Sequence, residues 1–516
     1  MNAVRQDVAE RAKSAIEYIR ERGGMLWSEN GQLRYRMPKG ALEPDIMEAL
    51  RASKPQIMKL LDATDHPVQA GRPGRALAPL TFSQLAHWTL YNLGEKQGIR
   101  QVASVTRLRG RLNIDAFNTS ADALVRHHDA LRTRIVSIDG QPMQEIAEHI
   151  HYKPQMADLR GMNESQCAAE VQRVINEAIL GPVDLARDAL FVMRLLTVKA
   201  DEHLVIMAME HTISDAASMN ILSRDLLLGY EKAMQGQAPS LPPVHVQFAD
   251  FSAWQRSTLP AWLERHGEYW QQVVAQSGRL RFPADASLSP AAARPGWEIA
   301  YFDIERELRA ELAAWCRQRR TTMVMAAFTA YIAVLMRWCD ATNAVVPFQS
   351  DSRTLAKLEN TVGFIASLLY FRIQLTGRES FLDLLALVED EYCRATEHAD
   401  SCYLESRVPR PDFTRNGCFN WIPQGAATST TVLDGADALQ VEPMTFQSPM
   451  RRRIEKDCEP SVVLFDSGDG VRGGVYFPLS RFAIETMNRF GQGYLESLRT
   501  LLRQPESLVK DPPAIQ

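Results

Sequence analysis

A histidine and an aspartate four residues apart, His211 and Asp215, form the pair whose types and spacing could do chemistry in this sequence. An unperturbed imidazole has a pKa of about 6.5, so it can accept a proton from an attacking hydroxyl or amine near neutral pH. The aspartate can brace the loop or complete a polar network around the ring. The alternative is that Asp215 caps a helix and that His211 is an ordinary loop histidine. The spacing alone leaves both interpretations open.

The segments on either side of this pair predict a fixed position for the imidazole. Residues 203–209 form a continuous apolar run, which is typical of a short strand buried on both faces. An amphipathic helix is predicted over residues 216–233, with apolar side chains along one side. A histidine at the end of a buried strand is held rigidly and can still reach a cleft.

The composition predicts an ordinary globular protein with more than one domain. The chain has 516 residues, of which 46% are hydrophobic and 23% are charged. Strand-like and helix-like stretches alternate over most of its length, which indicates an α/β fold. Residues 1–62 read as a small separate unit, in which Asn30-Gly31 predicts a hairpin turn. Residues 63–78 contain prolines and glycines and are typical of a linker.

Charge and hydropathy argue against several classes of partner. The net charge of −4 gives no reason to expect binding to nucleic acid or to an anionic membrane. The apolar stretches are too short for a membrane span, and the N-terminus lacks the apolar core of a signal peptide. Seven scattered cysteines without a Cys-x-x-Cys pair argue against disulfides and against a zinc site. We therefore expect a cytoplasmic protein without a metal.

Six short motifs follow one another in a fixed order between residues 79 and 505. They are PLTFSQLAHW (79–88), RHHDALRT (126–133), MEHTISDAAS (209–218), VQFADFSAWQ (246–255), VGFI (362–365) and RNGCF (415–419). Together they resemble the ordered motifs of condensation domains from non-ribosomal peptide synthetases. His87, Trp88 and the two histidines of the second motif are expected to stabilise the first lobe rather than to do chemistry.

The resemblance implies an α+β fold of two lobes similar to chloramphenicol acetyltransferase, arranged in a V around a tunnel. The lobes would span residues 79–260 and 261–510. In that family carrier proteins deliver thioesters on phosphopantetheine arms, and the second histidine of the signature lies midway along the tunnel. His211 then stands at the catalytic position, and Asp215 is a structural residue that pairs with Arg353. Asn416 stands where the family often faces the tunnel. The alternatives are that Arg353 is an exposed loop arginine and that Asn416 is a turn residue.

Two positions depart from the family signature, in which two histidines precede the aspartate and a glycine follows it. Glu210 replaces the first histidine and Ala216 replaces the glycine. Glu210 is either a buried partner that raises the basicity of His211 or a residue that merely ends the strand. Such altered signatures are similar to those of ester-forming, chain-releasing condensation enzymes, as in the polyketide line that makes enacyloxin. The other implication is an inactive platform that recruits enzymes to carrier-bound intermediates.

The N-terminal unit resembles the tubulysin-type docking domains that precede condensation domains. Its hairpin offers unpaired backbone groups to an extended peptide, and Arg34, Arg36 and Lys39 would attract an acidic tail. The implied partner is the C-terminal tail of an acyl or peptidyl carrier protein. The alternative is a solvated basic hairpin without a partner.

The resemblance implies a free-standing acyltransferase of antibiotic biosynthesis, since no adenylation or carrier segment is recognised. It would transfer an acyl chain from the carrier to a hydroxyl, releasing an ester, or to an amine. The acceptor would be a small molecule or a second carrier protein. No cofactor is expected on this chain, because the pantetheine arm belongs to the carrier. An epimerisation domain of the same superfamily is a third alternative, which the docking unit argues against.

Overall fold

The computed structural model describes the backbone of most of the chain. The described residues are 25–29, 32–36, 54, 77–93, 100, 102–283, 285, 288, 296–353, 356–398, 411–423, 431–433, 438–444, 459–468 and 470–510. For 25–29, 32–36 and 431–433 only the backbone is described. Strands β1 (Met25–Glu29) and β2 (Gln32–Arg36) pair antiparallel, with Glu29 opposite Gln32, as the hairpin prediction requires.

The N-lobe is built on a six-stranded sheet in the order β14-β15-β4-β9-β8-β7. Its strands are β4 (Val102–Arg109), β7 (Gln155–Asp158), β8 (Phe191–Lys199), β9 (Glu202–Met209), β14 (Thr431–Leu433) and β15 (Leu439–Pro443). Helices α5 (Ile114–His127) and α7 (Ala216–Met234) pack on one face, and α6 (Glu164–Leu180) packs on the other. Side chains of β9 alternate between these two cores. The apolar run is therefore a central strand buried on both faces.

The N-lobe also contains a small second sheet. It has the order β3-β6-β5, with β3 (Leu77–Pro79), β5 (Thr133–Ile138) and β6 (Gln141–Ile146). Helix α4 (Phe82–Leu93) follows β3 directly. The buried side chain of Gln84 in α4 donates to the carbonyl of Thr212, 2.8 Å away, and so ties this helix to the turn after β9.

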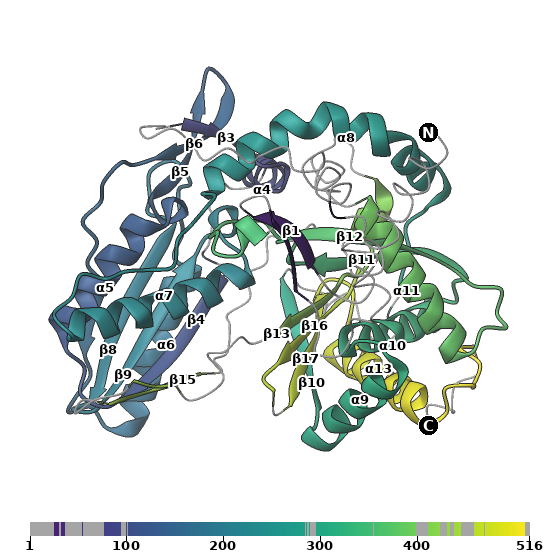
Figure 1. The fold of residues 1–516 in the computed structure, drawn as a ribbon. Coiled ribbons are helices and arrows are strands. Elements are labelled where there is room, and N and C mark those ends of the chain that lie inside the picture. Colours follow the sequence, from purple (N-terminus) through teal and green to yellow (C-terminus); the bar gives the residue numbers. More distant parts are fainter. Residues whose placement is uncertain are drawn as a thin grey trace.

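The C-lobe repeats the plan of a sheet covered by helices. Its six strands, in the order β10-β17-β16-β13-β11-β12, are β10 (Trp297–Ile304), β17 (Val471–Pro478), β16 (Ser461–Asp466), β13 (Phe419–Pro423), β11 (Asn343–Ser350) and β12 (Ser367–Gln374). Helices α9 (Arg306–Arg319), α10 (Met323–Trp338), α11 (Phe381–Glu397) and α13 (Ile484–Arg503) lie on the side of the sheet away from the N-lobe (Figure 1). Helix α10 is buried along almost its whole length and forms the centre of this core.

Two segments cross between the lobes, which form the arms of a V in Figure 1. Helix α8 (Phe248–Gln276) spans the closed end of the V. The second crossing is β15, which follows the C-lobe strand β13 in sequence but pairs antiparallel with β4 of the N-lobe sheet. The sequence-based boundary between residues 260 and 261 therefore falls inside α8, and part of the 261–510 segment belongs to the N-lobe sheet.

Within the described residues no single helix is both long and apolar enough to cross a membrane. Helices α9 and α10 reach the required length and composition only when taken together across a bend of 107°. Because α10 is a buried core helix, its apolar character is explained by packing.

Candidate active site

His211 lies two residues beyond the end of β9, in a single 3₁₀ turn, η2 (His211–Ile213). Its Nδ1 atom donates to the carbonyl of Ser214 at 2.8 Å. A carbonyl oxygen can only accept, so the neutral ring carries its hydrogen on Nδ1 and its lone pair on Nε2. The ring is half-buried, neither sealed in the core nor fully exposed to solvent. This is the tautomer and the accessibility that a general base needs.

Two further rings meet the imidazole of His211. The ring of Phe364, in the loop between β11 and β12 of the C-lobe, has its centroid 4.3 Å away. The ring of His87, on α4 of the N-lobe, has its centroid 5.3 Å from His211 and 5.0 Å from Phe364. The three rings come from three separate elements and from both lobes, so the imidazole lies where the lobes meet.

Asp215 is the N-cap of α7 and is buried, with 2% of its surface exposed. Its carboxylate accepts bonds from the amide and hydroxyl of Ser218 at 2.9 and 2.7 Å. It also accepts from the C-lobe amides of Ile365 and Ala366, at 3.1 and 3.0 Å. Burial would raise the pKa of this carboxyl, but Arg353 and the other donors hold it below its usual value. Asp215 is therefore an ionised anchor between the lobes.

Arg353 is the cation that faces this carboxylate, and its side chain is only 5% exposed. Its two terminal nitrogens donate to the two oxygens of Asp215 at 2.9 and 3.0 Å. The same guanidinium bonds to the carbonyls of Thr361 and Gly363 and to the carboxylate of Asp351. Burial lowers the pKa of Arg353, but its two acidic partners raise it, and the net shift is upward. The structure therefore contains the pair that the resemblance implied, and Arg353 is not an exposed loop arginine.

Glu210 is buried and its carboxylate points back to the turn that carries His211. It accepts a hydrogen bond from the backbone amide of Thr212, so it is the N-cap of η2. Since Nδ1 of His211 bonds to the Ser214 carbonyl instead, the structure favours the second of the two interpretations, a residue that ends the strand and shapes the turn. Burial raises the pKa of Glu210, and the amides of Thr212 and His211 oppose this rise.

Asn416 links two backbone segments of the C-lobe and does not reach into a cleft. It is buried, with its amide oxygen accepting from the backbone of Leu280 and its amide nitrogen donating to the carbonyl of Val345, both at 2.7 Å. Both ends of the side chain therefore join backbone segments of the same lobe. The side chain of Asn416 therefore does not face a tunnel, because the turn before β13 directs its amide to the backbone.

Of the docking residues inferred from the sequence, Arg34 and Arg36 lie in β2, opposite Trp27 and Met25 of β1. Lys39 lies outside the described residues.

One group of three potential metal ligands occurs in the part of the chain that the structure describes: His127, His128 and Asp225. Its members already have other partners. The Nε2 atom of His127 donates to the carbonyl of Pro242 at 2.8 Å, and that of His128 lies 3.0 Å from Asp225. Arg224 donates to the other oxygen of Asp225. This cationic neighbour fits a buried network that joins α5 to α7 better than it fits a metal site.

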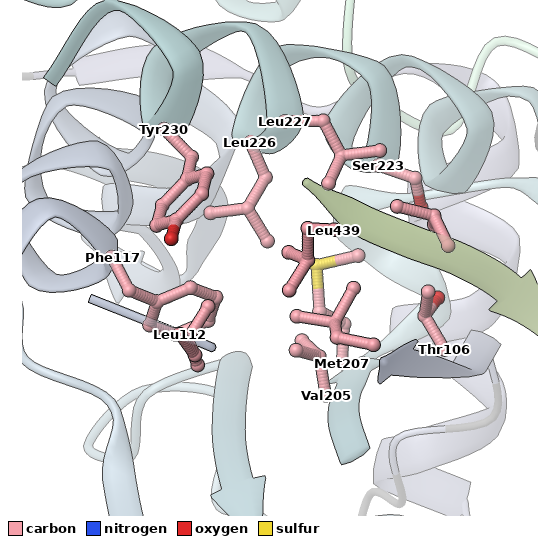
Figure 2. A pocket seen from close by; sticks show the side chains of 12 residues that line it. Thr106, Leu112, Phe117, Val205, Met207, Ser223, Leu226, Leu227, Tyr230 and Leu439 are labelled. Carbon is pink, nitrogen blue, oxygen red and sulfur yellow. The ribbon is translucent and has the colours of Figure 1, made fainter. Parts of the chain in front are cut away.

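A cavity of about 20 Å³ lies in the N-lobe between α5, α7 and the strands β4, β9 and β15 (Figure 2). It has room for about one water molecule and is mostly apolar. Its lining includes Phe117, Met207, Leu226, Tyr230, Leu439 and Val441. The residues of the His211 site are not part of this lining, so the cavity is a packing gap beneath β15.

His87 is the residue at this site that sequence reasoning missed. The sequence predicts that His87 packs within the first lobe, yet its ring lies beside His211. The signal that could have found His87 is the motif in which it lies. Gln84, three residues earlier in the same motif, bonds to the turn that holds His211.

Comparison with known proteins gives two family matches. The model described as condensation domain matches residues 75–514, and the one described as TubC N-terminal docking domain matches residues 13–62. Among curated relatives, a linear gramicidin synthase of Brevibacillus parabrevis is 29% identical over 324 residues, which is 62% of this chain and 6% of that protein. Phosphinothricin tripeptide synthetase PhsC of Streptomyces viridochromogenes is 27% identical over 440 residues, or 83% of this chain and 39% of that protein. The chain thus spans well under two thirds of the length of these relatives.

Solved structures show the same fold at low identity. The EpoB cyclization-docking bidomain from Sorangium cellulosum has a TM-score of 0.72 at 17% identity, covering 97% of this chain and all of that one. SgcC5 from Streptomyces globisporus has a TM-score of 0.68 at 22% identity, covering 83% of this chain and all of that one. These likenesses confirm the predicted α+β fold.

Proposed function

This chain belongs to the condensation domain family, whose members are acyltransferases, and we propose that it moves an acyl chain from a carrier-bound thioester to a hydroxyl or amine. The observation that carries the proposal is the placement of His211. Its Nδ1 is fixed by the Ser214 carbonyl, and its ring lies half-exposed where the lobes meet. The same fixed Nδ1–H would stabilise the imidazolium that forms when Nε2 takes a proton.

The proposed reaction balances without a redox step. The oxygen or nitrogen of the acceptor attacks the thioester carbon while His211 takes its proton, and a C–O or C–N bond forms. The C–S bond then breaks, its electron pair stays on sulfur, and the thiolate recovers a proton. Asp215 and Arg353 hold the turn and the loop that carry His211 and Phe364, so they act as positioning residues. The phosphopantetheine arm would be supplied by the carrier protein as part of the substrate.

A hydroxyl acceptor, giving an ester and releasing the chain, is the finer form of the proposal. It is supported by the departures from the family signature, Glu210 and Ala216. It also fits the chemistry of a fixed base, because a hydroxyl must lose its proton during attack, whereas an amine can lose it later. The setting would be an assembly line that makes a peptide or polyketide antibiotic.

The carrier protein would be recruited through the hairpin β1–β2 by its C-terminal tail. Support comes from the match of residues 13–62 to a docking domain and from the cations Arg34 and Arg36 in β2. An extended peptide can add to a hairpin edge through main-chain bonds, and basic residues favour an acidic tail.

The test is a reconstituted transfer. A carrier protein with an acidic C-terminal tail is loaded with an acyl chain and offered matched acceptors that differ only in a hydroxyl or an amine. Ester and amide products are followed by mass spectrometry, with His211→Ala and the exposed-residue variant His149→Ala in parallel. Product that depends on His211 supports acyl transfer, and its bond type decides between ester and amide. Carrier binding without turnover would support the inactive platform instead.

A further inference from the structure

The site holds two imidazoles rather than one, and the second has no part in the mechanism described so far. His87 and His211 lie with ring centroids 5.3 Å apart and ring planes inclined by 55°. Both rings are half-buried. The buried ring of Phe364 touches both, with centroids 5.0 and 4.3 Å away, and so fixes their separation.

The position of His87 is set by the fold and not by a flexible loop. It lies in the middle of α4, whose first turn is held by Gln84 and Thr81. Gln84 also bonds to the carbonyl of Thr212, in the 3₁₀ turn that begins with His211. One hydrogen bond therefore couples the helix that carries His87 to the turn that carries His211.

Acyl transfer involves two proton transfers, one from the acceptor and one to the sulfur, and a single imidazole performs both only if its Nε2 reaches both atoms. The ring of His211 is held by Ser214 on one side and by Phe364 on a face, so its Nε2 points in one direction. If that atom faces the acceptor, the proton for the departing sulfur comes from a second donor. Assistance by a general acid matters more for an alkyl thiolate than for an aryl thiolate, because the alkyl thiolate is the more basic leaving group.

From this geometry we propose that His87 is a second catalytic residue, which donates a proton to the thiolate that leaves the thioester. The inference rests on the proposed acyl transfer and deepens it. The acceptor's proton passes to His211 as the new bond to the acyl carbon forms. The C–S electron pair goes to sulfur, and the proton on sulfur comes from His87. A proton then moves from His211 to His87, directly or through water, and restores both rings.

The test uses two leaving groups of different acidity. One acyl group that the enzyme transfers is offered as an N-acetylcysteamine thioester and as a thiophenyl ester, whose aryl thiolate leaves without help. In single turnovers, His87→Phe should slow the alkyl thioester about 100-fold or more and the thiophenyl ester only a few-fold. Phenylalanine keeps the ring contact with Phe364 and removes the proton. His87→Asn, a second variant, should show the same selectivity.

Trp88→Phe is the matched control, since Trp88 neighbours His87 on α4 and packs against the N-lobe core. It should leave both rates within a few-fold of the unsubstituted chain, and thermal melting verifies that each variant is folded. An equal loss for both esters in His87→Phe, or no loss, overturns the inference and leaves acyl transfer standing. If instead His211→Ala leaves both rates unchanged, the proposed function itself fails, and this inference fails with it.

Discussion

Arg353 of the C-lobe and Asp215 of the N-lobe form a bidentate ion pair, in which two nitrogens meet two oxygens at 2.9 and 3.0 Å. Both side chains are at most 5% exposed. Asp215 lies four residues after His211, at the start of α7, and Arg353 lies in a segment that is far away in the sequence. The lobes are therefore tied together directly beside the candidate base.

Breaking this pair should destabilise the protein strongly. Arg353→Met leaves the Asp215 carboxylate buried without its cation, and a loss of about 3–5 kcal/mol in the free energy of unfolding is expected. Chemical denaturation measures it. The double variant Asp215→Leu/Arg353→Met should lose less than the sum of the two single variants, since it buries no lone charge. Additive losses would contradict the coupling.

Glu210→Gln should make the protein more stable at alkaline pH. Burial raises the folded-state pKa of Glu210 above its usual 4.5, so the folded protein holds this proton more tightly than the unfolded chain does. Stability therefore falls as the pH rises from 4.5 through the folded pKa, by about 1.4 kcal/mol for each unit of the shift. Glutamine can still accept from the Thr212 amide and carries no charge. Denaturation at pH 4 and pH 8 should show a gain only at the higher pH.

The same variant separates the two interpretations of Glu210. If the carboxyl only caps the turn, kcat and its pH profile should be close to those of the unsubstituted enzyme. A profile displaced along the pH axis would instead indicate that Glu210 tunes the basicity of His211.

His211→Ala should reduce the rate of acyl transfer by about 100- to 10,000-fold, the range for loss of a general base. The KM for the thioester should change little, because the imidazole acts on the acceptor's proton. His149→Ala, at a position whose side chain is 81% exposed, should leave the rate unchanged. A His211→Ala enzyme with full activity would remove the assignment.

Gly363→Ala should disturb the loop that brings Phe364 and two amides to the site. An added Cβ would lie 2.3 Å from ring carbons of Phe248, which is buried and cannot move aside. The expected cost is about 1–3 kcal/mol of stability, with a fall in kcat as the loop shifts from α7. Gly267→Ala is the control, because it lies in α8 with nothing within 4 Å and should stabilise slightly. Thermal melting and turnover of both variants provide the check.

Reversing the charge of the hairpin should affect carrier-bound substrates only. Arg34→Glu/Arg36→Glu is expected to raise the KM for a carrier with an acidic tail, and high salt should reduce the difference. The rate with an N-acetylcysteamine thioester, which needs no docking, should stay the same. If the charge-reversed variant and the unsubstituted chain have equal KM values for the carrier, the result would argue against the docking role.

Sequence reasoning reached the site where local pattern or ordered motifs carried the information. The apolar run 203–209 predicted a strand buried on both faces, and motif order led to His211, Asp215 and Arg353. It did not place His87 beside His211, because that contact depends on how α4 packs on the turn after β9. The direction of the Asn416 amide and the partner of β15 were missed for the same reason, since each is set by residues distant in the sequence.

The strand β15 has a practical consequence for recombining such enzymes. Residues 440–443 pair with β4, although they follow most of the C-lobe in the sequence. In a hybrid joined within α8, β4 from one parent would pair with β15 from the other parent. A fragment that ends within α8 would lack β15 and leave β4 as an unpaired edge strand, which is open to aggregation. Productive chimeras should therefore exchange the first lobe together with β14 and β15, as a graft of two pieces.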